Sequence, residues 1–232
     1  MVKNMCLTAV SCLALMQCAG TAMKVMPEYA TMKVQDSRLG IILINQDLSI
    51  ANTDDVVDDL GGGAAKTVFS GFFGTQMTSF AKKDSKFGTV SFIDNGDTSG
   101  LISSTQNLSA DDPIYLRIPP TKIFRGDSVP YLLIFDNFDI SREQKPGTTG
   151  FGANGAMATT AGSDKLILTG TFVLWDNLAG KIVSFGKINE KQGVFMAMTK
   201  NTWIGILRKL SSKVFIGKPY GKAASQDESA AQ

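Results

Sequence analysis

The chain has no histidine, and its three cysteines (Cys6, Cys12 and Cys18) all lie at the start of its 232 residues. Without imidazole there is no Ser-His or Cys-His nucleophile pair and no histidine-ligated metal. Without a thiol after Cys18 there is no zinc ribbon, redox cysteine pair or internal disulfide. We therefore expect a protein that is not an enzyme and that carries no cofactor and no metal.

Charge is also sparse. Only 19% of residues are charged, 44% are hydrophobic, and the net charge is +2. This composition allows a substantial core in one large domain or two small ones. A net charge so near zero argues against nucleic acid as a partner.

The first residues have the pattern of an export signal. Lys3 precedes an apolar run from Met5 to Met16 that only Thr8 and Ser11 interrupt. As a helix this run covers about 18 Å, against about 30 Å of bilayer hydrocarbon. We therefore predict a signal peptide over 1–17 rather than a membrane span.

The signal ends in a motif that resembles a bacterial lipobox. Residues 15–20 read Leu-Met-Gln-Cys-Ala-Gly, with leucine three positions before Cys18 and small residues after it. In such signals the cysteine is lipidated and becomes the mature N-terminus. Met16 and Gln17 depart from the pattern, where small residues are usual. We predict a palmitate-bearing lipid on Cys18 and a periplasm-facing position in a bacterial cell envelope, at the outer membrane.

Two alternatives to lipidation remain open. Ordinary signal cleavage after Gly20 or Ala22 would give a soluble exported protein, and an uncleaved N-terminus would act as an anchor. For the rest of the chain we predict a lipidated tether at 18–37, a domain at 38–222 and a disordered tail at 223–232.

Short apolar runs indicate the strands of that domain. Such runs are too short for helices and are typical of buried strands. They lie at 39–44, 87–93, 114–118 and 131–135. The segments 166–175 and 181–188 flank an Asp-Asn-Leu-Ala-Gly turn and predict a hairpin.

Helical spacing of apolar residues predicts helices over 64–83 and from Trp203 to Val214. The first has aspartates upstream and Lys82 and Lys83 at its end, as the helix dipole favours. Helices and strands together predict an α/β (α+β) fold, a single mixed β-sheet with helices packed on it.

Two segments are rich in small polar residues and predict loops. Residues 97–112 are rich in Ser, Thr and Asp, and residues 141–165 are rich in Gly, Thr and Ala. The second would be a long flexible loop in the domain.

The sequence around Gly61-Gly62-Gly63 invites a phosphate-binding interpretation, because backbone amides at a helix start bind anions. A P-loop ending at Lys66-Thr67 would need glycine where Leu60 and Ala65 stand. We therefore interpret the glycines as a hinge or a point of close packing. The turn at 94–97 has oxygen ligands but lacks the ligand spacing of a calcium loop.

Three carboxylates raise a catalytic alternative. Asp136, Asp139 and Asp176 are expected at strand ends, where the paired acids of a glycosidase would stand. A carboxylate-dependent hydrolase of an envelope polymer is therefore one alternative function.

Charge is distributed unevenly. Residues 181–222 hold nine basic side chains and one acidic one, Glu190, whereas residues 36–59 hold six aspartates and one arginine. One interpretation is a solvated helix face with complementary packing inside the fold. The other is a surface for acidic lipid head groups, an anionic cell-wall polymer or an acidic protein. The candidate partner-binding residues are Lys200, Arg208, Lys209, Lys213 and Lys218.

The order of segments, and the strand–turn–strand Phe-Val-Leu-Trp-Asp-Asn-Leu-Ala-Gly-Lys-Ile-Val at 172–183, resemble a known group. It is the superfamily of exported lipoproteins that includes the curli secretion channel and the penicillin-binding-protein activators. The resemblance implies a variable insertion at 141–165, which forms membrane-spanning hairpins in channel members. Here the insertion has only Phe151 and Met157 as sizeable apolar residues, so it departs from a lipid-facing strand pattern.

The function predicted first is a non-enzymatic, membrane-anchored envelope lipoprotein that binds a partner protein or assembles with itself as a homo-oligomer. The alternatives are a subunit of an outer-membrane export or transport assembly and the hydrolase described above.

Overall fold

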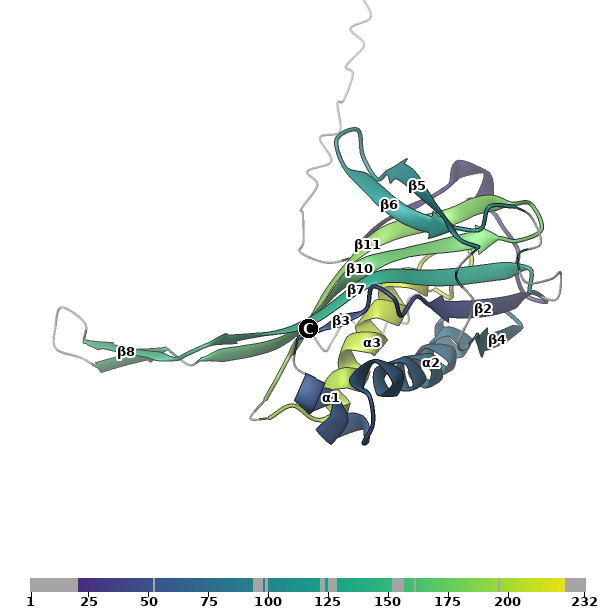
Figure 1. Ribbon diagram of the computed structural model, residues 1–232. Coiled ribbons are helices and arrows are strands. Elements are labelled where there is room, and N and C mark those ends of the chain that lie inside the picture. Colours follow the sequence, from purple (N-terminus) through teal and green to yellow (C-terminus); the bar gives the residue numbers. More distant parts are fainter. Residues whose placement is uncertain are drawn as a thin grey trace, which may run out of the picture.

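A computed structural model describes residues 21–51, 53–93, 98, 100–121, 124, 129–151, 157–160, 162–195 and 197–223. The predicted signal peptide, Cys18, the turn at 94–97 and the tail from residue 224 lie outside these residues. Over the described part the fold is a mixed β-sheet with helices packed on it, which confirms the predicted fold class (Figure 1).

The sheet has the strand order β1-β11-β10-β7-β2-β4, and β3 also pairs with β7. β2 is parallel to both β4 and β7, while β7, β10, β11 and β1 form antiparallel pairs. Parallel strands are buried on both faces, which explains the continuous apolar run in β2. The bounds are β1 (Ala22–Val25), β2 (Arg38–Leu43), β3 (Ser49–Ile50), β4 (Thr89–Phe92), β7 (Tyr131–Lys145), β10 (Ser163–Asp176) and β11 (Lys181–Gly193).

Helices cover one face of this sheet. They are α1 (Thr53–Leu60), α2 (Ala65–Asp84) and α3 (Lys200–Phe215), with a short 3-10 turn η1 at Pro27–Tyr29. The predicted helices at 64–83 and 203–214 are confirmed. Gly61 and Gly63 separate α1 from α2 with φ values of 122° and 128°, which side chains other than glycine rarely adopt.

The opposite face is covered by a hairpin of β5 (Ile102–Asn107) and β6 (Pro113–Ile118). Ile114 and Leu116 point inward to a second apolar cluster that includes Trp175 and Phe185. The loop predicted over 97–112 is therefore wrong for β5. The reason is that the polar strand β5 is stabilised by backbone pairing with the more apolar strand β6 and not by side chains of its own.

The described residues of the segment 141–165, which are 141–151, 157–160 and 162–165, form a long hairpin rather than the predicted loop. β7 and β10 continue past the core, and β8 (Thr148–Phe151) pairs with β9 (Met157–Thr160) beyond them. Figure 1 shows this hairpin projecting far from the rest of the domain, and we call residues 141–165 the arm. The prediction failed because glycine suggested flexibility, whereas the threonines between the glycines are β-branched and favour strands.

The segment 22–34 belongs to the domain, which corrects the tether predicted over 18–37. β1 pairs with β11 from Ala22↔Lys187 to Val25↔Ser184, and Val34 is buried. Tyr29 packs against the main core. The short alternating pattern of Met23 and Val25 suffices for an edge strand because β11 supplies the ladder. Among the described residues, no helix is long and apolar enough to cross a membrane.

Candidate functional site: the arm and the basic edge of α3

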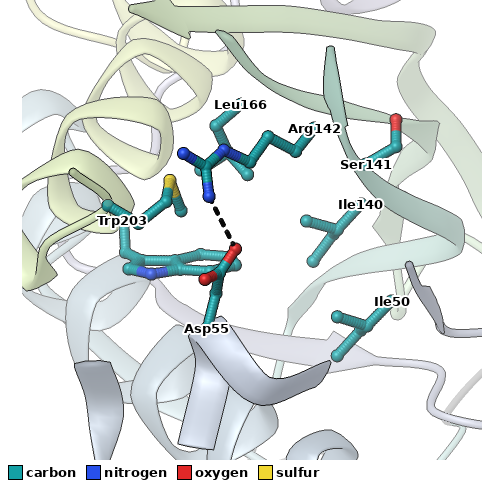
Figure 2. A pocket seen from close by; sticks show the side chains of 8 residues that line it. Ile50, Asp55, Ile140, Ser141, Arg142, Leu166 and Trp203 are labelled. Carbon is teal, nitrogen blue, oxygen red and sulfur yellow. Dashed lines mark hydrogen bonds and ion pairs between the residues drawn. The ribbon is translucent and has the colours of Figure 1, made fainter. Parts of the chain in front are cut away.

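An ion-pair network fixes the base of the arm. Arg142 on β7 donates from Nε to Asp164 Oδ1 on β10 at 2.9 Å and from Nη1 to Asp55 Oδ2 on α1 at 3.3 Å. The bond from Arg142 lowers the pKa of the Asp164 carboxyl, and the same bond raises the pKa of the guanidinium. The arm is thereby attached to α1 as well as to its own partner strand (Figure 2).

A small pocket lies beside this network. Its walls include Ile140, Leu166, Met198 and Trp203, and it has room for about one water molecule. Trp203 is buried and donates from Nε1 to Asp59 Oδ2 at 2.9 Å, so it anchors α3 to α1. Figure 2 shows the indole under the Arg142 guanidinium and beside Asp55. The space suits a structural junction rather than a substrate.

The outer part of the arm differs from its base. Residues 146–163 contain no charged side chain. In this part Thr149 pairs with Thr159, and Phe151 pairs with Met157, so the two sizeable apolar residues of 146–163 are cross-strand neighbours in the backbone register. Among the described strands, β8 and β9 pair only with each other. The arm tip is therefore a neutral two-stranded ribbon with two open edges.

The three candidate carboxylates are not brought together as a pair. Asp136 pairs with Thr171 and Asp176 with Tyr131 in the same ladder, which places them about 17 Å apart along the strands. Asp139 is exposed and pairs with Thr169. This arrangement gives no support to the hydrolase alternative.

Two of these carboxylates have local structural roles. Asp136 is buried, accepts from the Asn137 N–H at 2.8 Å, and lies 3.2 Å from Arg117 Nε. Burial raises the pKa of Asp136 more than these two groups lower it. Asp176 Oδ1 accepts from the Leu178 and Ala179 N–H groups and so caps the β10–β11 turn.

The five candidate basic residues do not form one surface. Arg208 donates to the buried Asp84 at 3.0 Å and lies over the Phe80 ring, so its charge is used inside the fold. Lys209 and Lys213 are exposed, four residues apart on α3, and therefore share a face of that helix. The other two are Lys200 at the first turn of α3 and Lys218 beyond its end.

The glycine run before α2 and the acidic groups show no ligand site. Gly61 and Gly63 form the turn between two helices, and Gly74 packs directly against Phe92. In the described part of the chain, no three Asp, Glu, Cys or His side chains lie close enough to hold a metal ion.

Several residues that organise the fold have no signal in the sequence. Arg117, Arg142 and Asp84 find their partners across strands and helices far away in the chain. Only Glu190 stands out, as the single acid in a basic segment, and its structural partner is Thr21.

No protein-family profile matches the chain, and no curated protein matches it. Among solved structures it is similar to a PelC dodecamer from Paraburkholderia phytofirmans, with a TM-score of 0.40, 10% identity, and coverage of 88% of this chain and 98% of that one. It is also similar to a putative neuraminyllactose-binding hemagglutinin homolog from Helicobacter pylori, with a TM-score of 0.38, 13% identity, and coverage of 78% and 83%. At these values neither structure carries an argument about this chain.

Proposed function

We propose that the protein is a non-enzymatic, lipid-anchored envelope protein that assembles with further copies of itself through the arm. The observation that carries the proposal is the open ribbon of β8 and β9. An isolated two-stranded hairpin is only marginally stable in water, and its unpaired edges are templates for another strand. Pairing with the arm of a second copy satisfies those edges.

The rest of the molecule supports a scaffold rather than a catalyst. The chain has no histidine, and the candidate carboxylates are separated and used in turns and ion pairs. The arm is joined to the domain by Arg142, which bonds to both β10 and α1. Such a junction holds the arm in a defined direction, which lowers the entropic cost of assembly.

The test is to remove the arm tip without disturbing its base. Lys145 and Ser163 are paired, so residues 146–162 can be replaced by the two-residue turn Asn-Gly. We expect the full chain to sediment as an oligomer in detergent and the shortened chain to sediment as a monomer with an unchanged circular dichroism spectrum. A full chain that is monomeric at all concentrations, or a shortened chain that still assembles, contradicts the proposal.

A point variant tests strand pairing by the arm without removing any residues. Thr149→Lys places a charge on the exposed ribbon, and charges on edge strands oppose pairing between sheets. Thr105→Lys adds the same charge on the exposed β5 strand and serves as the matched control. We expect only Thr149→Lys to shift the protein toward monomer.

The anchor has its own test. We expect radiolabelled palmitate to be incorporated into the full chain and not into Cys18→Ser, and processing to be sensitive to globomycin. Unchanged processing of Cys18→Ser contradicts lipidation and favours ordinary cleavage after Gly20 or Ala22.

A second candidate function is a subunit of an outer-membrane export or transport assembly. It is favoured by the absence of charge over residues 146–163 and by the resemblance to the superfamily named above. Conductance across planar bilayers that depends on the arm would support it. An assembled, anchored protein that gives no conductance would leave self-assembly as the function.

A further inference from the structure

Three lysines lie along the edge where α3 packs beside β11. Lys209 donates from Nζ to the Lys191 carbonyl at 2.8 Å, and Lys213 follows one turn later on the same face of α3. Gly205, one turn before Lys209, faces the Gln192 side chain, which confirms that this face of α3 lies along β11. Lys191, Lys209 and Lys213 are all exposed, and we call them the basic edge. The Lys191 side chain leaves β11 on the face opposite to Gln192 and lies near the carboxylate of Glu143, whose pKa it helps to lower.

Neither β11 nor α3 supplies an exposed acid to neutralise the basic edge. Their one acidic residue, Glu190, is only 5% exposed and accepts hydrogen bonds from Thr21. Two other cations of these elements are already paired, Lys187 with Asp112 and Arg208 with Asp84. The basic edge therefore has no exposed acid on its own two elements, a property that it shares with the exposed Lys181 of β11 and Lys200 of α3.

The N-terminus brings the predicted anchor to this same edge. Thr21 donates from its backbone N to Glu190 Oε1 at 3.2 Å and from Oγ1 to the same atom at 2.6 Å. Cys18 is three residues before Thr21, so a lipid on it lies within about 10 Å of that point. Lys191 directly follows Glu190. The chain before the sheet is thus too short to lift the domain away from a membrane.

We propose that the basic edge docks on a bilayer surface containing anionic lipid, so that the domain lies directly against the membrane. This inference rests on the lipid anchor of the proposed function and not on assembly through the arm. Each lysine near an anionic surface contributes about a fivefold preference for the docked state, so Lys209 and Lys213 together contribute about 25-fold. Lys191 adds less, because Glu143 lies near it. Nucleic acid and protein partners do not explain why the basic edge adjoins the anchor.

The test uses the lipidated full chain in vesicles of phosphatidylcholine with or without 30% phosphatidylglycerol. Because Cys18 is the only cysteine after the signal peptide, Ser212→Cys beside the basic edge gives a single site for a fluorophore. Thr75→Cys on the exposed surface of α2 gives the matched control site. We expect a head-group spin label to quench the Ser212 site strongly in anionic vesicles and the Thr75 site weakly.

Charge and tether length are then varied separately. The triple variant Lys191→Gln, Lys209→Gln, Lys213→Gln should lose the extra quenching in anionic vesicles, whereas Lys66→Gln, Lys82→Gln, Lys83→Gln on α2 should keep it. Inserting 20 Gly/Ser residues between Gly20 and Thr21 gives a tether of about 25 Å and should reduce quenching in neutral vesicles.

The outcomes distinguish this inference from the proposed function. Equal quenching at both sites, or an unaffected triple variant, with palmitate present on Cys18 overturns docking and leaves the anchor intact. Absence of palmitate on Cys18 overturns the anchor and docking together. The arm variants test assembly independently of both results.

Discussion

Arg117 reaches from the β5–β6 hairpin to the centre of the sheet, where its Nε lies 3.2 Å from the buried Asp136 Oδ2. The guanidinium also pairs with Asp47 in the loop after β2. One arginine thus fastens the hairpin both to the central strand β7 and to the loop after β2. It also compensates the charge of a carboxylate that burial destabilises.

This pair predicts an asymmetry between two substitutions. Arg117→Met leaves the Asp136 carboxylate buried without its cation and should lower the free energy of unfolding by about 2 kcal/mol or more. Asp136→Asn removes the buried charge itself, and Arg117 keeps Asp47, so the loss should stay within about 1 kcal/mol. Urea unfolding of the two variants measures both losses. Equal losses of unfolding free energy would show that leaving the Asp136 charge without its cation is not what destabilises Arg117→Met.

The same carboxyl predicts a dependence on pH. Burial raises the pKa of Asp136 in the folded protein above its unfolded value of about 3.9. The folded state therefore binds this proton more tightly, and the resulting stability is present below the unfolded pKa and is lost as the pH rises through the folded pKa. The difference in unfolding free energy between the wild type and Asp136→Asn should fall over that window. A difference that rises with pH contradicts the assignment.

Two glycines of α2 predict opposite effects of alanine. A Cβ on Gly74 would overlap the Phe92 ring, so Gly74→Ala forces α2 away from β4 and should cost about 1–3 kcal/mol. A Cβ on Gly71 meets nothing within 4 Å, so Gly71→Ala should stabilise the helix by about 0.5–1 kcal/mol. Thermal unfolding measures both effects: Gly74→Ala should lower Tm, and Gly71→Ala should raise it. A change of the opposite sign in either variant contradicts the prediction.

The edge strand β1 predicts a local effect at Glu190. Glu190→Leu removes the acceptor of both Thr21 hydrogen bonds, so β1 should open more often while the domain stays folded. Hydrogen exchange at Met23 and Val25 should accelerate about tenfold, with little change at Phe172. Glu190→Gln keeps an acceptor oxygen and is the control. Uniform acceleration over the whole chain would mean global destabilisation instead.

Periodicity and apolar runs were sufficient to predict the buried strands, the two long helices and the mixed sheet. These patterns describe how each segment buries its own side chains, and this burial alone was enough to predict β2 and α2. They could not predict β1, β5 or the arm, because these strands are held by a neighbour in the ladder rather than by their own apolar residues. Met23 and Val25 alternate over only four residues, and β5 is largely polar, so neither has a pattern to detect.

The candidate site shows the same limit. The charge bias of 181–222 indicated a basic surface, and Lys209 and Lys213 do lie together on α3. The sequence could not show that Arg208, unlike these lysines, is used in an ion pair inside the fold, because its partner Asp84 is far away in the chain. The sequence suggested Asp136 and Asp176 as a pair only because both are carboxylates expected at strand ends. The strand register places them far apart.

The arm grows from β7 and β10, the two adjacent strands in the middle of the sheet. Any load on its tip is therefore delivered along those strands, and the ladders to β2 and β11 resist it by shear over many hydrogen bonds at once. An appendage on an edge strand would peel away one bond at a time. The base of the arm consequently resists a pull on the tip as strongly as the central strands of the sheet resist being drawn past their neighbours.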